Sequence, residues 1–142
     1  MRVNFRRNLP KAAARRIARQ RSGVGVLRQG AIMTDNLTEQ VLNLFHLNDK
    51  QRAAAKERGK AVVVTAGAGS GKTSTLVARY AYLLAEGTKP RRIAAITFTK
   101  KAAQEMRSRI RAKLMEMQDQ ATDETQQSFW ANLSAQMDSA RI

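Results

Sequence analysis

A glycine-rich segment that joins an apolar run to a helical pattern constrains the fold of this chain more than any other feature. Residues 61–65 are apolar and mostly β-branched, which favours a buried strand of a parallel sheet. Residues 66–73 follow and read Ala-Gly-Ala-Gly-Ser-Gly-Lys-Thr, and helical periodicity begins directly after them. A strand, a glycine-rich loop and a helix in this order predict a phosphate-binding loop.

Each part of this loop has a chemical role in holding a triphosphate. Glycines permit left-handed torsions and leave no Cβ between the backbone amides and an anion. The next helix directs its unpaired N–H groups and positive dipole end at the same point. We expect Lys72 to contact the terminal phosphates and the Thr73 hydroxyl to bind Mg²⁺, which makes these two the candidate catalytic residues. The predicted phosphate-binding residues are Ala66, Gly67, Ala68, Gly69, Ser70, Gly71, Lys72 and Thr73.

Ala66 departs from the usual pattern G-x-x-x-x-G-K-[ST], whose first position is glycine. Alanine is a mild change there, because the backbone approaches the phosphates most closely near the second glycine. A glycine-rich turn that binds nothing is the alternative interpretation. The apolar strand before the loop and the Gly-Lys-Thr at its end favour the phosphate site.

Composition excludes several other kinds of chemistry. The chain of 142 residues has no cysteine, which excludes disulfides and thiolate metal sites within it, and its single histidine, His46, excludes zinc sites built on several histidines. No apolar run is long enough to cross a membrane, and the basic N-terminus lacks the apolar segment of a secretory signal. We therefore expect no membrane partner and a cytoplasmic location.

The net charge of +15 is concentrated at the N-terminus. Residues 1–32 hold nine basic and no acidic residues, whereas residues 33–142 hold 17 basic and 11 acidic ones. We predict a basic, disordered leader over residues 1–32, with a nucleic-acid-binding arm as the alternative. Met33 begins a sequence typical of the start of a soluble protein, so we hypothesise that translation starts there. The intact mass of the native protein tests this hypothesis.

The rest of the chain predicts an α/β fold with a parallel sheet and flanking helices. Helices are expected over residues 37–47, 49–58, 72–86, 100–117 and 121–141, and a second parallel strand over residues 93–97. A strand, a helix and a strand in this order form a right-handed crossover. Asn48 is a plausible N-cap of the second helix, and Gly87 and Pro90 end the third.

Two positions outside the loop are candidates for binding. Gln51 precedes the loop, and its amide can both donate to and accept from the edge of adenine, although an exposed helical glutamine without a function is the alternative. Thr97, Phe98, Thr99 and Lys100 follow the second predicted strand, where ligands of α/β sheets gather. Phe98 can stack a nucleic-acid base beside hydroxyls and lysines, with a core aromatic as its alternative role.

Three blocks of sequence resemble the UvrD/Rep-type superfamily 1 DNA helicases. The first block, Leu47-Asn48-x-x-Gln51-x-x-Ala54, resembles their Q motif. Residues 66–73 are similar to their motif I, including its leading alanine, and residues 96–106 are similar to their motif Ia. The resemblance covers residues 45–118. It implies a partial RecA-like P-loop NTPase fold, with residues 33–142 as the N-terminal portion of the ATP-binding domain.

The resemblance also implies roles for individual residues. Gln51 would contact adenine, Lys72 and Thr73 the phosphates and Mg²⁺ of ATP, and Phe98 to Lys100 single-stranded DNA or a duplex junction. Ser74 is also predicted to bind the nucleotide, because it stands where many members place an arginine near it. Lys100 stands where many members have asparagine. These departures favour an AddA/RecB-like or exodeoxyribonuclease V-like branch, which would bring a nuclease partner.

Several parts that such an enzyme requires have no candidate in this sequence. No Asp-Glu pair follows a strand after motif Ia, and no arginine from a second RecA-like domain can be assigned. We therefore expect the chain to be the N-terminal fragment of an ATP-dependent 3′-to-5′ DNA helicase of repair or recombination. Alone, the fragment should bind nucleotide without appreciable hydrolysis. The rival interpretations are a stand-alone nucleic-acid-binding module that uses the Arg-rich N-terminus, and a small P-loop kinase.

Overall fold

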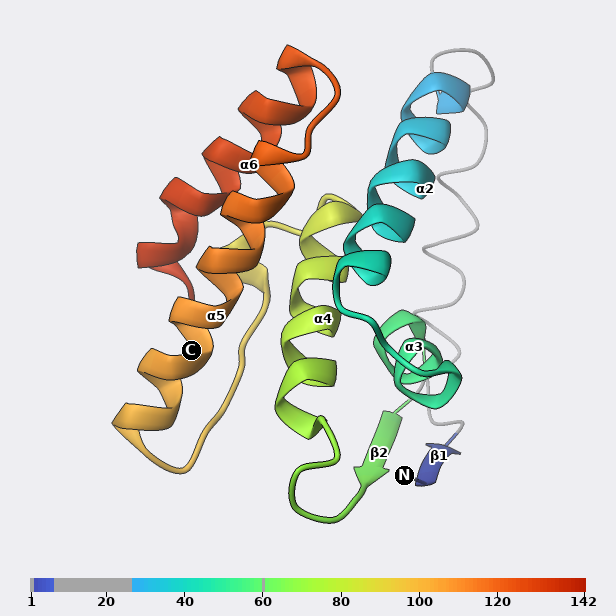
Figure 1. Ribbon diagram of the computed structural model, residues 1–142, viewed down its shortest axis with the longest axis vertical. Coiled ribbons are helices and arrows are strands. Elements are labelled where there is room, and N and C mark those ends of the chain that lie inside the picture. Colours follow the sequence, from blue (N-terminus) through green and yellow to red (C-terminus); the bar gives the residue numbers. More distant parts are fainter. Residues whose placement is uncertain (1, 7–26, 60) are drawn as a thin grey trace, which may run out of the picture.

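The computed structural model describes residues 2–6, 27–59 and 61–142 (Figure 1). The elements are β1 (Arg2–Arg6), α2 (Leu27–Leu44), α3 (Asp49–Lys56), β2 (Ala61–Thr65), α4 (Lys72–Ala85), the 3-10 turn η1 (Pro90–Arg92), α5 (Lys100–Asp119), α6 (Glu124–Gln136) and the 3-10 turn η2 (Met137–Ser139). None of the described helices combines the length and the apolar character that crossing a membrane requires.

The long helices lie side by side, with α4 between α2 and the α5–α6 pair, and the two strands lie at the end where α4 begins (Figure 1). The core between them is made of apolar side chains from all four helices. Its buried members include Leu37, Val41, Val77, Tyr80, Leu84, Met106, Ile110, Leu114, Met117, Trp130, Leu133 and Met137. Burial of these faces is the main source of stability for helices of this length.

The helical periodicity of the sequence is confirmed in the second half of the chain. Helix α5 buries residues three and four positions apart, namely Met106, Ile110, Leu114 and Met117. Trp130 of α6 is fully buried and meets Phe129 edge to face, which agrees with a role in packing. Asp123 and Thr99 accept hydrogen bonds from backbone amides of the first turns of α6 and α5, so both helices begin at side-chain caps.

The predicted parallel sheet is wrong for the described residues. Strand β2 pairs antiparallel with β1, and Val64 lies opposite Val3 in the register. The expected second strand over residues 93–97 is an irregular segment with one isolated parallel bridge, between Ala94 and Arg141. A strand needs neighbours to pair its backbone groups, and in the part of the chain that the structure describes no parallel neighbour lies beside β2.

The side chains show the same difference. Residues 61–65 were expected to be buried, yet their exposure alternates and Val63 is 47% exposed. Ile96 of the other predicted strand is 93% exposed. Apolar β-branched side chains are normally buried by neighbouring parts of a sheet. Their exposure here indicates that such neighbours are absent among the described residues.

The leader predicted to be disordered, residues 1–32, has regular secondary structure in its two described parts. Residues 2–6 form β1, and residues 27–32 belong to the first turns of α2. Residues 7–26 lie outside the described part of the chain. The boundary at residue 32 therefore remains a prediction.

A left-handed residue ends α2. His46 has φ 47° between α2 and α3, a conformation in which its Cβ is crowded, and its N–H donates to the Asn43 carbonyl at 3.4 Å. We expect His46→Gly to raise the free energy of unfolding by about 0.5–1 kcal/mol, because glycine removes this crowding and only part of the gain is lost to the entropy of the unfolded chain. Urea denaturation measures the change. His46→Ala, which keeps the Cβ, is the control, and an equal gain in that variant would contradict the explanation.

Candidate nucleotide-binding site

Residues 66–71 connect the end of β2 to the first turn of α4 at the lower end of the molecule in Figure 1. Gly69 and Gly71 have φ of 73° and 81°, so the expected left-handed torsions are present at these two glycines. Gly71 is the N-cap of α4 and no side chain caps this helix. The first amides of α4 therefore remain available to an anion.

Lys72 is folded back onto the loop. Its Nζ donates to the carbonyls of Ala66 and Gly67, each at 2.6 Å, and the Ser70 hydroxyl donates to the same Gly67 carbonyl at 2.7 Å. These neutral carbonyls are weaker partners for an ammonium group than phosphate oxygens. The lysine is thus held at the loop by bonds that a triphosphate can replace. Thr73 lies next to it and is exposed.

Gln51 lies against the loop rather than in solvent. It forms a capping box with Asn48, in which the Gln51 Oε1 accepts from the Asn48 N–H at 2.9 Å and the Gln51 N–H donates to Asn48 Oδ1 at 3.0 Å. Its Nε2 donates to the Ser70 carbonyl at 3.1 Å, and the side chain is buried. The amide retains a second hydrogen on Nε2 and a second lone pair on Oε1. The alternative prediction of a solvent-exposed Gln51 is therefore wrong, and its contact with adenine stays a prediction.

Helix α3, which carries Gln51, is also fastened to α2. Glu39 of α2 accepts hydrogen bonds from Lys56, at 2.6 Å, and from Arg52. Arg52 also donates to Asn43 Oδ1 at 3.1 Å. The hydrogen bond from Lys56 is the main reason that the pKa of Glu39 is below its usual value. These groups are partly exposed, so they orient α3 more than they stabilise the fold.

The second group of predicted site residues lies in the irregular segment before α5. Thr99 caps α5 through the Ala102 N–H at 3.1 Å, and the Thr97 hydroxyl donates to the Thr99 carbonyl at 3.1 Å. Phe98 is fully exposed, which overturns its alternative role as a core aromatic in this structure. Lys100 is exposed at the first position of α5. Figure 1 places this end of α5 and the loop before α4 at the same end of the molecule.

Two hollows flank α4. One of about 590 Å³ lies between α3, β2 and α4, and its lining includes Val62, Val64, Lys72, Leu76 and Arg79. Leu76, predicted to face the core, is 45% exposed there. The lining of this hollow thus combines apolar side chains with the cations Lys72 and Arg79.

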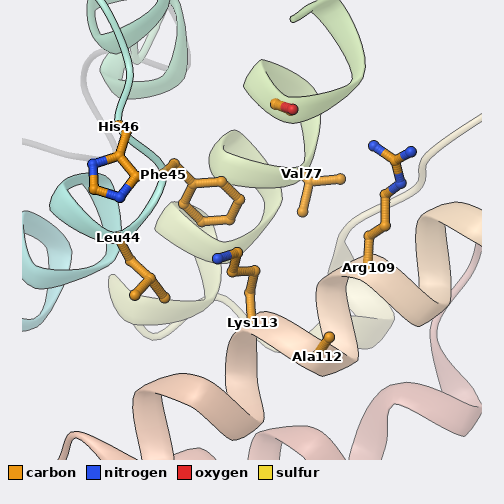
Figure 2. A pocket seen from close by; sticks show the side chains of 8 residues that line it. Leu44, Phe45, His46, Val77, Arg109, Ala112 and Lys113 are labelled. Atoms are coloured by element: carbon orange, nitrogen blue, oxygen red, sulfur yellow. The ribbon is translucent and has the colours of Figure 1, made fainter.

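The other hollow, of about 400 Å³, lies between the end of α2, α4 and α5 (Figure 2). Leu44, Phe45, Val77 and Ala112 form its apolar part. Lys113 points at the Phe45 ring, with Nζ 5.4 Å from the ring centroid, and donates to Glu116 at 2.7 Å. Sequence analysis gave no signal for this contact, because the two residues lie on elements far apart in the chain.

The described residues contain no group of three or more His, Cys, Asp or Glu side chains that could hold a metal ion. Any Mg²⁺ at the loop would therefore be held through Thr73 and the phosphates themselves, which is how magnesium is commonly bound in nucleotide sites.

Comparison with known proteins identifies the family of this chain. The model of a protein family, the UvrD/REP helicase N-terminal domain, matches residues 47–138, which include Gln51, the phosphate loop, the segment before α5 and the whole of α6. The chain belongs to this family. Membership confirms the resemblance found in the three sequence blocks. It is consistent with a RecA-like fold, although the described residues contain no parallel sheet.

The UvrD/REP match is supported by individual relatives. The chain is 57% identical to DNA helicase II of Salmonella typhimurium over 68 residues, which are 47% of this chain and 9% of that protein. It is 52% identical to a probable DNA helicase of Mycoplasma pneumoniae over 66 residues, 46% of this chain and 12% of that protein. It is 45% identical to one subunit of the ATP-dependent helicase/nuclease of Latilactobacillus sakei over 83 residues, 58% of this chain and 9% of that protein. No solved structure matches the chain. The matched segments span about a tenth of the length of these relatives.

Proposed function

We propose that this chain supplies the adenine contact, the phosphate loop and the first DNA contact of an ATP-dependent DNA helicase. The observation that carries the proposal is the side chain of Gln51 bonded to Ser70 of a phosphate loop whose α4 amides are open. An adenine reader and a phosphate cradle in contact with each other fit ATP better than a lone phosphate ligand. Mg²⁺ is assigned to the Thr73 hydroxyl in this proposal.

The wider assignment extends to the longer protein of which this chain would be a part. We assign that protein 3′-to-5′ unwinding of DNA in repair or recombination, in the cytoplasm. The similarity to the helicase/nuclease of Latilactobacillus sakei supports the branch that works with a nuclease.

By itself, this chain should bind Mg²⁺–ATP without turning it over. Each missing transition-state group typically costs about 10²–10³ in rate, and both the Asp-Glu pair and the second-domain arginine are without candidates in this sequence. Isothermal titration of the 142-residue chain with Mg²⁺–ATP and a phosphate-release assay measure the two quantities. Nucleotide binding without phosphate release is expected, and measurable steady-state hydrolysis would contradict the assignment of this chain as a binder.

The DNA contact is assigned to Thr97, Phe98, Thr99 and Lys100. The fully exposed Phe98 ring next to the α5 N-terminus supports this assignment, because stacking on an aromatic contributes about 1–3 kcal/mol per base. We expect Phe98→Ala to weaken binding of a single-stranded oligonucleotide by about tenfold or more, as measured by fluorescence anisotropy.

A control distinguishes DNA binding through Phe98 from the rival function, in which a basic module binds nucleic acid through residues 1–32. Deleting residues 1–32 from the chain should lower the salt dependence of DNA binding without removing the effect of Phe98→Ala. If the deletion abolishes DNA binding and Phe98→Ala has no effect, the rival function is correct.

A further inference from the structure

Arg79 reaches from α4 to the far end of the helix that carries Gln51. It lies seven residues after Lys72, about 10 Å further along α4. Its Nη1 donates to the carbonyls of Ala54, at 2.9 Å, of Ala55, at 3.3 Å, and of Glu57, at 2.8 Å. The last carbonyls of a helix have no partner within it, and a cation there also meets the negative end of the helix dipole. Arg79 thus provides hydrogen-bond donors to the free backbone carbonyls at the C-terminus of α3.

This cap cannot readily be replaced by water. Ala54 and Ala55 are 2% and 0% exposed, and α3 has only eight residues. Burial lowers the pKa of Arg79, with Arg58 acting in the same direction, which is the cost of removing the guanidinium from water. A short helix with buried, unpaired carbonyls would lose its position against α4 if the guanidinium were removed.

Together with Gln51, Arg79 closes a ring of contacts. At the N-terminal end of α3, Gln51 Nε2 donates to the Ser70 carbonyl of the loop. At the C-terminal end, Arg79 holds α3 to α4, and α4 begins directly at the loop. Helix α3 is therefore held at both of its ends, and this fixes the position of Gln51 relative to the phosphate loop. None of these contacts of Arg79 involves a residue assigned to the phosphates.

We propose that Arg79 is a positioning residue that sets Gln51 against the phosphate loop and so determines the selectivity of the site for adenine over other bases. The inference rests on the proposed function, because it requires that the loop binds ATP and that Gln51 contacts the base. Arg79 itself does not touch the nucleotide. Removing the Arg79 side chain should therefore weaken recognition of the adenine base and leave binding of the phosphates unchanged.

The test compares three ligands on the full 142-residue chain: Mg²⁺–ATP, Mg²⁺–GTP and Mg²⁺–tripolyphosphate, each by isothermal titration. Arg79→Met removes the donors at similar length and should lower the affinity for ATP by about tenfold, with the ATP:GTP ratio falling towards one. The affinity for tripolyphosphate should change by less than about twofold, since the loop is untouched. Arg79→Lys keeps a cation and should give intermediate ATP:GTP selectivity.

Arg58→Met is the matched control. Arg58 also joins the end of α3 to α4, by an ion pair with Glu86 at 2.9 Å, but its side chain is 53% exposed and makes no hydrogen bond to the carbonyls of α3 in the described residues. The Arg58→Met variant removes one positive charge near the C-terminus of α3, as Arg79→Met does, but its ATP:GTP selectivity should not change.

The outcomes separate this inference from the function on which it rests. A wild-type chain that binds tripolyphosphate but does not prefer ATP to GTP, or that binds neither, would overturn the adenine assignment and the inference with it. A selective wild-type chain whose Arg79→Met variant remains equally selective would overturn the inference alone. So would an equal loss of ATP and tripolyphosphate binding, which indicates a merely structural role. If Arg79→Met does not fold, the selectivity of Arg79→Lys decides in the same way.

Discussion

Replacing Lys72 by methionine is expected to lower the affinity of the chain for Mg²⁺–ATP by about 10- to 100-fold. The Lys72 Nζ already lies at the loop, bonded to the Ala66 and Gly67 carbonyls at 2.6 Å. On binding, negatively charged phosphate oxygens would take the place of these neutral carbonyls, and the ammonium would then be paired with an opposite charge. Methionine keeps the length of the side chain and removes only the cation. Isothermal titration of both chains with Mg²⁺–ATP measures the effect.

A variant of equal charge isolates the position of this cation. Lys50 is an exposed residue of α3 that makes no ion pair within the described residues, so Lys50→Met lowers the net charge by the same amount. Its affinity for Mg²⁺–ATP should stay within about twofold of the wild type at physiological salt. If both variants lost affinity equally, the general positive charge of the chain would explain nucleotide binding and the loop assignment would fail.

The loop and the helices after it were predictable because their signals are local. A phosphate loop depends on glycine torsions and on the start of the next helix, all within residues 66–73. The spacing of Met106, Ile110 and Leu114 likewise fixes the buried face of α5 without knowledge of its neighbours. The match of the UvrD/REP family to residues 47–138 agrees with the same local blocks.

The sheet was not predictable in the same way, because a strand is defined by its partners. Residues 61–65 form a strand, but beside β1 and antiparallel, and residues 93–97 contain only the bridge of Ala94 to Arg141. The apolar, β-branched composition of both segments indicates burial between neighbours on two faces. Within the described residues those neighbours are lacking, which explains why Ile96 is 93% exposed.

Contacts between distant elements were also beyond sequence reasoning. The capping box of Asn48 and Gln51 follows from their spacing, but the bond from Gln51 to the Ser70 carbonyl does not. The same holds for Arg79, whose partners lie 22 to 25 positions earlier in the chain. A long cationic side chain on a helix is most often solvated, and only the position of α3 against α4 reveals that this one caps another helix.

Gly71→Ala is expected to lower the free energy of unfolding by about 2–4 kcal/mol. Two separate costs contribute. Gly71 has φ 81°, where a Cβ is crowded by its own backbone, and a Cβ built there would lie 2.7 Å from Gln51 Nε2. Gln51 cannot move away freely, because its amide is bonded to both Asn48 and Ser70. The alanine should therefore also weaken Mg²⁺–ATP binding, by displacing Gln51 or the loop.

Gly69→Ala separates these two costs. Gly69 has φ 73° but a Cβ there would meet nothing within 4 Å, so this variant carries the backbone cost alone, about 1 kcal/mol after the gain from a stiffer unfolded chain. Urea denaturation of both variants in the wild-type and Gln51→Ala backgrounds completes a double-mutant cycle. Without the Gln51 side chain, the cost of Gly71→Ala should fall to that of Gly69→Ala. If it stays the same in both backgrounds, Gln51 does not restrain residue 71, and the contact between the adenine reader and the phosphate loop has no energetic weight.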